Sequence, residues 1–159
     1  MPRLLVLLSL LVSVSAVRSA EITVPAMRTR VVANRSELVK ACGTTNRVFG
    51  CTSFVGQTLT CACELVGGSW RIRGAAQFIP YVSIYSKQMD GIAHEKDHVN
   101  DIRTWLSEYL QQLESRTYSS SEECNRDGLS ESASFKSRMD GWKVRSNEDR
   151  HPELKMARR

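Results

Sequence analysis

The sequence is poor in the residues that define non-globular chains, because only 4 of its 159 residues are proline and only 9 are glycine. This composition excludes collagen-like and proline-rich classes, and the chain has neither an internal repeat nor a low-complexity segment. Hydrophobic residues make up 42% of the chain and charged residues 25%. These proportions suit one globular domain rather than two domains or a disordered or fibrous protein.

A strong excess of one charge is also missing, since 22 basic and 17 acidic residues give a formal net charge of +5. The basic residues are spread along the chain, with their largest local excess near the C-terminus. A nucleic-acid binder carries a concentrated basic patch instead. The sequence therefore predicts no nucleic-acid partner.

The longest apolar run, residues 4–14, follows a short basic start and precedes the small residues Ser15 and Ala16. This order is typical of a secretory signal peptide, here residues 1–16, with cleavage after Ala20 as the alternative. The run is shorter than the roughly 20 residues that span a bilayer, so no stable membrane anchor is expected after cleavage. We expect a secreted or periplasmic protein.

All five cysteines lie beyond this segment, and in an oxidising compartment they allow up to two disulfides and one odd thiol. Cys61 and Cys63 stand two residues apart in a predicted strand, so they point to the same face and are poorly placed to bond to each other. We expect Cys124 to bond to Cys61 or Cys63, with Cys42 and Cys51 as the second pair.

The pattern of β-formers, glycines and apolar periodicity predicts an α+β fold, in which a small antiparallel sheet precedes a long helix and a C-terminal helix. Pro80 suggests that residues 77–84 form an edge strand, where an extended substrate could pair. The predicted domain spans residues 21–146, followed by a charged, disordered tail at 147–159. The expected elements are a strand in 21–34, a short helix at 37–41, several short strands in 47–86, the long helix at 91–116, a polar loop at 117–128 and a last helix at 130–145.

The long helix contains the pattern HExxH, formed by His94, Glu95 and His98. Residues four apart on a helix lie one turn above each other, so both imidazoles can reach one zinc ion, with the glutamate beside them as general base. On a helical wheel Glu95 falls at the centre of the apolar arc. A purely structural helix would not bury an unpaired carboxylate there, because the burial is costly.

These residues resemble the zincin superfamily of metallopeptidases and, more narrowly, a bacterial family of small, predicted secreted zinc-dependent proteases. The resemblance covers residues 60–145. It implies a cysteine-bearing strand at 63–66, a strand ending at Pro80, the HExxH helix, a loop with Cys124, and a last helix carrying Asp140. The family's last motif also has a threonine and a histidine-glycine pair after its aspartate, and residues 141–145 do not contain them.

The resulting hypothesis is a secreted zinc peptidase that acts on peptide or protein substrates. His94 and His98 would hold Zn²⁺ together with Asp140, or with Glu131 as the alternative third ligand, and Glu95 would activate a zinc-bound water. The rival hypothesis is a non-catalytic exported module that binds zinc or another protein.

Two further residues are candidates for supporting roles in this site. Asp101 could accept the outer N–H of one imidazole, or be a solvated surface residue. His151 is a candidate ligand or transition-state donor, but its place in the charged tail favours disorder.

Overall fold

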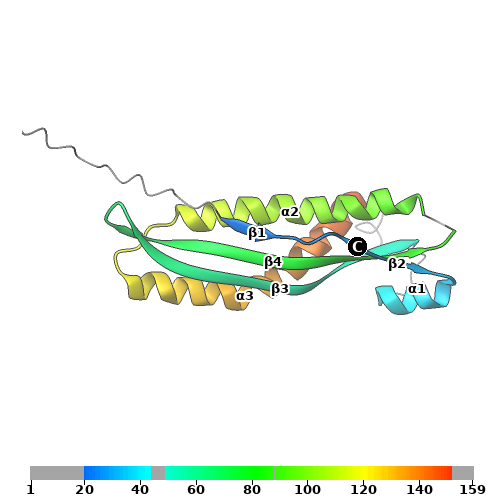
Figure 1. The fold of residues 1–159 in the computed structure, drawn as a ribbon, viewed down its shortest axis with the longest axis horizontal. Helices are drawn as coiled ribbons and strands as arrows, with labels where there is room; N and C mark the ends of the chain where they lie inside the picture. Colours follow the sequence, from blue (N-terminus) through cyan, green and yellow to red (C-terminus); the bar gives the residue numbers. More distant parts are fainter. Residues whose placement is uncertain (1–19, 44–48, 88, 152–159) are drawn as a thin grey trace, which may run out of the picture.

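The computed structural model describes residues 20–43, 49–87 and 89–151. The predicted signal peptide and residues 152–159 of the predicted tail lie outside these ranges. The elements follow the chain in this order (Figure 1): β1 (Glu21–Thr23), β2 (Arg28–Val32), α1 (Arg35–Cys42), β3 (Gly50–Val66), β4 (Ser69–Tyr85), α2 (Gly91–Ser115) and α3 (Ser121–Arg150). The chain thus has the predicted α+β class.

The sheet differs from the predicted small antiparallel one. Its central strand is β4, which pairs antiparallel with β3 but parallel with both β1 and β2. Two of the three pairings are therefore parallel, and the prediction of an antiparallel sheet was wrong. The parallel partners come from residues 21–32, which were expected to be one strand but form two short ones.

The glycines do not divide residues 50–85 into short strands as predicted, because β3 and β4 are 17 residues long each. Only Gly67 and Gly68 form the turn between the strands, and Gly56 lies at a bulge with a positive φ of 62°. Pro80 lies in the central strand, so the predicted edge strand for substrate pairing was also wrong. It falls between the end of the β1 pairing at Gln77 and the start of the β2 pairing at Tyr81.

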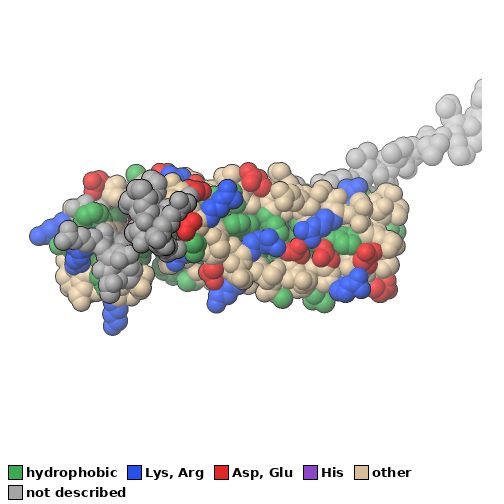
Figure 2. Space-filling model, turned by 180° about the vertical axis from the view of Figure 1, so that it is seen from behind, with side chains coloured by type: hydrophobic (Ala, Val, Ile, Leu, Met, Phe, Trp, Pro, Cys, Tyr) green, Lys and Arg blue, Asp and Glu red, His purple; other side chains and the backbone are tan. Residues whose placement is uncertain are grey.

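Both long helices cover one face of the sheet and form the core with it (Figure 1). Every second residue of β4 from Ile72 to Ile84 is buried, as the two-residue period of a strand requires. Helix α2 ends one residue before its predicted end and buries the apolar stripe that its sequence shows. On the face seen in Figure 2, basic and acidic side chains are interspersed.

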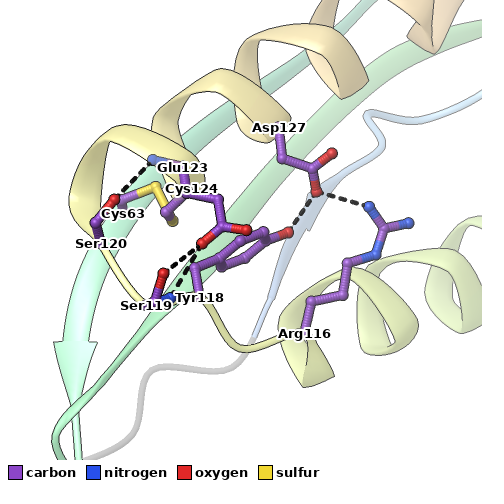
Figure 3. The surroundings of a disulfide bond; sticks show 8 residues. All are labelled: Cys63, Arg116, Tyr118, Ser119, Ser120, Glu123, Cys124 and Asp127. Atoms are coloured by element: carbon purple, nitrogen blue, oxygen red, sulfur yellow. Dashed lines mark hydrogen bonds and ion pairs between the residues drawn. A yellow bond between two sulfur atoms is a disulfide. The ribbon is translucent and has the colours of Figure 1, made fainter.

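Helix α3 is longer than predicted at both ends. Its N-cap is Ser120, whose Oγ accepts a hydrogen bond from the Glu123 N–H, while the Glu123 carboxylate accepts from the N–H and Oγ of Ser119 (Figure 3). These reciprocal bonds satisfy N–H groups that the first turn would otherwise leave without a partner. The predicted loop therefore ends at Ser120, and residues 147–150, expected to be disordered, form the helix's last turn.

Two disulfides connect helices α1 and α3 to strand β3. Cys42 at the end of α1 is bonded to Cys51 in β3, and Cys124 in α3 is bonded to Cys63 (Figure 3). The second bond resolves the predicted choice in favour of Cys63, and Cys61 remains a free, half-buried thiol whose pKa is raised by burial. Two disulfides fit an oxidising compartment. None of the helices within the described ranges combines the length and the hydropathy of a membrane span.

Candidate metal centre

The three histidines of the chain meet at one end of the molecule. His94 and His98 lie one turn apart in the first half of α2, and His151 caps the C-terminus of α3. They meet because α3 runs antiparallel to α2 and so brings its last turn to the first turns of α2. The Nε2 atoms of His94 and His151 are 3.0 Å apart, and the rings of His94 and His98 are in edge contact with centroids 4.9 Å apart.

This arrangement could hold a metal ion. One ring nitrogen from each histidine lies within 4.8 Å of the other two. A tetrahedral ion with bonds of about 2.1 Å needs nitrogen separations of about 3.4 Å, so small side-chain rotations would complete the site. Three imidazoles form a ligand set that suits zinc, copper, iron or nickel.

The environment of His98 favours its neutral form, which is the form that binds metal. Burial, followed by the neighbouring His94 and His151, lowers the pKa of His98 to about 4. Its Nδ1 lies 2.8 Å from the Oγ of Ser146, and that hydroxyl donates to Asp101 Oδ2 at 2.7 Å. Asp101 thus reaches His98 through Ser146 rather than directly.

Glu95 lies beside the histidines and is only 6% exposed. Thr52 of β3 donates from Oγ1 to Glu95 Oε2 at 2.7 Å, and the same Oγ1 lies 3.1 Å from the Glu95 carbonyl oxygen. Burial raises the pKa of Glu95, although the Thr52 hydrogen bond and the nearby His151 act in the opposite direction. The Glu95 carboxyl group is therefore buried, held by Thr52, and takes up a proton more readily than an exposed glutamate does.

Gly50 provides the space that Glu95 occupies. A Cβ at this position would lie 2.9 Å from Glu95 Oε1 and 3.0 Å from Ile84 Cδ1. Both contacts are closer than ordinary van der Waals distance, so a side chain here would displace the carboxylate. The first residues of β3 therefore shape the site from the sheet side.

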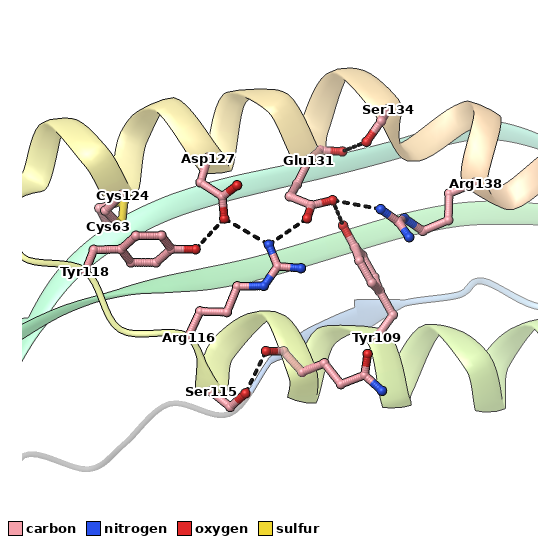
Figure 4. A network of polar contacts seen from close by, with 11 residues as sticks. Cys63, Tyr109, Ser115, Arg116, Tyr118, Cys124, Asp127, Glu131, Ser134 and Arg138 are labelled. Atoms are coloured by element: carbon pink, nitrogen blue, oxygen red, sulfur yellow. Dashed lines mark hydrogen bonds and ion pairs between the residues drawn. A yellow bond between two sulfur atoms is a disulfide. The ribbon is translucent and has the colours of Figure 1, made fainter.

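The structure does not bring either predicted carboxylate ligand to the histidines. Asp140 is exposed on α3, and the group of described residues that could hold a metal contains only the three histidines. Glu131 lies in the first half of α3, away from the histidines, and its carboxylate accepts hydrogen bonds from Tyr109, Arg116 and Arg138 (Figure 4). Burial alone would raise the pKa of Glu131, but the hydrogen bonds from Arg116 and Tyr109 lower it overall.

Four residues of the site had no place in the sequence prediction: Gly50, Thr52, Ser146 and Arg150. The two on β3 carry no sequence signal, because their nearness to the HExxH helix arises only from the packing of sheet and helix. Ser146 and Arg150 had a partial signal, since they stand four apart and Arg150 directly precedes His151. A helix prediction that extended to Pro152 would have placed all three on the last turns of α3.

No protein-family model matches the chain, and no match was found among curated proteins or solved structures. The residues of the site therefore carry the functional argument by themselves.

Proposed function

We propose that the protein is an exported zinc-dependent hydrolase, and most simply a peptidase. The observation that carries the proposal is the buried carboxylate of Glu95 beside three histidines that can share one metal ion. A site that only stores metal or holds the fold together needs no such carboxylate. The export part of the proposal is supported by the two disulfides and by the signal peptide predicted at 1–16.

In this proposal His94, His98 and His151 hold the ion. His151 is the third ligand, instead of the Asp140 or Glu131 predicted from the sequence. When bound by these three imidazoles, zinc would supply Lewis-acid chemistry toward a substrate carbonyl.

Glu95 accepts the proton of the attacking water on its carboxylate and passes it to the leaving amine of the cleaved peptide bond. Thr52 fixes the carboxylate by its hydrogen bond to Oε2. The same carboxylate thus serves as base in the first step and as acid in the second.

The first experiment measures zinc content and zinc affinity of the purified protein and of single variants. About one zinc per chain is expected in the parent, and His94→Ala and His151→Ala should both weaken binding, since each loses a ligand. Asp140→Ala is the matched control, because it removes an exposed carboxylate from the same helix as His151. A parent that binds no zinc, or a His151→Ala variant that binds as tightly as the parent, would contradict the ligand assignment.

The second experiment follows cleavage of a broad peptide library by mass spectrometry. Glu95→Gln keeps the shape of the side chain but cannot accept the proton, so it should retain zinc and lose cleavage by a factor of about 10² to 10⁴. Cleavage at the parent rate would place the general base elsewhere. Zinc binding without any cleavage by the parent would favour the non-catalytic module instead.

A further inference from the structure

The last turn of α3 does more than supply a ligand. Ser146 is 1% exposed, and its hydroxyl lies between the His98 ring and the Asp101 carboxylate. Arg150, one turn later on α3, makes a bidentate contact with that carboxylate: Nε donates to Oδ2 and Nη2 to Oδ1, each at 2.7 Å. A third donor of Arg150, Nη1, reaches Asp97 at 3.2 Å.

The direction of these hydrogen bonds follows from the protons available. A serine hydroxyl has one proton, and an ionised carboxylate can only accept. With Arg150 bound to both oxygens of Asp101, that carboxylate is ionised, so Ser146 gives its proton to Asp101. Its oxygen must then accept at the 2.8 Å contact with His98, which requires that His98 Nδ1 carries a proton.

We propose that Ser146 is a positioning residue that, together with Asp101 and Arg150, holds His98 as its Nδ1–H tautomer with the Nε2 lone pair free for the metal. A neutral imidazole has one proton, so fixing it on Nδ1 leaves Nε2 as the only donor to metal. The inference rests on the proposed metal site, but its structural part concerns the protein before metal binds.

The arrangement also explains why the site is built across two helices. His98 belongs to α2, whereas the hydroxyl that orients it and the third histidine both belong to the last turns of α3. The packing of α3 against α2 therefore orients His98 and also places His151 beside it. Outer hydrogen bonds of this kind change metal affinity by 10- to 100-fold when they are removed.

The test measures the ¹⁵N chemical shifts of the His98 ring in metal-free protein at neutral pH, and then zinc affinity. In the parent, Nδ1 should show the shift of a protonated ring nitrogen and Nε2 that of an unprotonated one. Ser146→Ala should move part of the population to the Nε2–H tautomer and weaken zinc binding about 10- to 100-fold.

Two further variants separate orientation from simple loss of structure. Ser146→Thr keeps the hydroxyl, and Ser146 lines a small cavity together with Thr52, Phe54 and Ile102, so this variant should keep the parent tautomer and affinity. Ser137→Ala removes an exposed serine from the same helix and should change neither.

A proton on Nε2 of His98 in the metal-free parent would overturn the inference, as would a Ser146→Ala variant with unchanged tautomer and zinc affinity. Both results leave the proposed function standing. A parent with the Nδ1–H tautomer that binds no zinc would support the tautomer assignment and remove the proposed function.

Discussion

The two disulfides should stabilise the protein to different extents and protect different parts of it. Cys63 and Cys124 are 61 residues apart in the chain, whereas Cys42 and Cys51 are 9 apart. In the chain-entropy description, each bond restricts the unfolded chain, and the restriction grows with the loop that it closes. Loops of these lengths correspond to about 4 kcal/mol for the long pair and about 3 kcal/mol for the short pair at 25 °C.

Their positions predict different local effects. The short pair fixes Cys51, which stands between Gly50 and Thr52, at the end of the molecule where Glu95 lies. The long pair fixes the first turn of α3 to β3, at the opposite end of that helix. Removing the short pair should therefore loosen the start of β3, and removing the long pair should loosen the start of α3.

The perturbation is a pair of double variants, Cys42→Ala/Cys51→Ala and Cys63→Ala/Cys124→Ala. Each variant leaves the cysteines of the other pair, and Cys61, unchanged. Urea unfolding at constant slope gives the loss of stability, which should be larger for the long pair because Cys124 is also fully buried. Amide hydrogen exchange then locates the loosened segment.

A greater loss of stability in the short-pair variant would refute the loop-length reasoning. Faster exchange at the start of β3 in the long-pair variant, with none in the short-pair variant, would refute the assignment of each bond to its end of the molecule.

Three further predictions concern packing and charge. Gly74→Ala should destabilise the protein by about 1–3 kcal/mol in urea unfolding, because the new Cβ would lie 2.7 Å from Cδ2 of the fully buried Leu110. Glu131→Ala should cost about 1–3 kcal/mol in the same assay, since it leaves Tyr109, Arg116 and Arg138 without their common acceptor. Asp140→Ala should change neither stability nor zinc affinity measurably, because this carboxylate is exposed. Because the pKa of Glu131 is lowered in the folded protein, its contribution is present above the ordinary glutamate pKa of about 4.3 and is lost as pH falls through the folded-state pKa. Glu131→Gln should flatten that acid loss in unfolding curves recorded between pH 3 and 6, and an unchanged pH profile would contradict it.

The long HExxH helix could be predicted from the sequence because its signals agree. Its apolar residues recur at the helical period, no proline or internal glycine interrupts it, and Glu95 stands out as a carboxylate within the apolar arc. The structure buries Glu95 and His98 where that pattern places them. The motif and its helix are thus a local property of this segment.

Helix α3 could not be predicted in full because its buried stripe is only partly apolar. The buried positions follow helical spacing, but they include a cysteine, a glycine, a glutamate and a serine: Cys124, Gly128, Glu131, Phe135, Met139 and Ser146. Gly128 was taken as the end of a loop, yet it lies within the helix, where a Cβ would come 3.0 Å from Cys61 Cβ. Close packing on β3, rather than propensity, determines that residue.

The prediction of several short strands was wrong for a related reason. Glycine in a strand can mark a turn, a bulge or a close approach, and the sequence alone does not distinguish them. Gly56 is a bulge and Gly74 admits Leu110, so neither ends a strand. The parallel pairing of β1 and β2 with β4 depends on contacts between segments more than 40 residues apart, for which no local pattern exists.

The proposed third ligand, His151, illustrates the limit of a motif most clearly, because its place beside His94 and His98 depends on the register between two helices. A slip of α3 by one residue would move each side chain by about 1.5 Å along the axis and about 100° around it, and would carry Ser146 away from His98. Contacts far from the histidines contribute to that register, namely the Cys63–Cys124 bond and the hydrogen bonds that tie Glu131 to Tyr109 and Arg116. Glu131, which the sequence offered as a ligand, thus acts at the other end of the helix pair, as one of several contacts that bring the end of α3 to the HExxH turn.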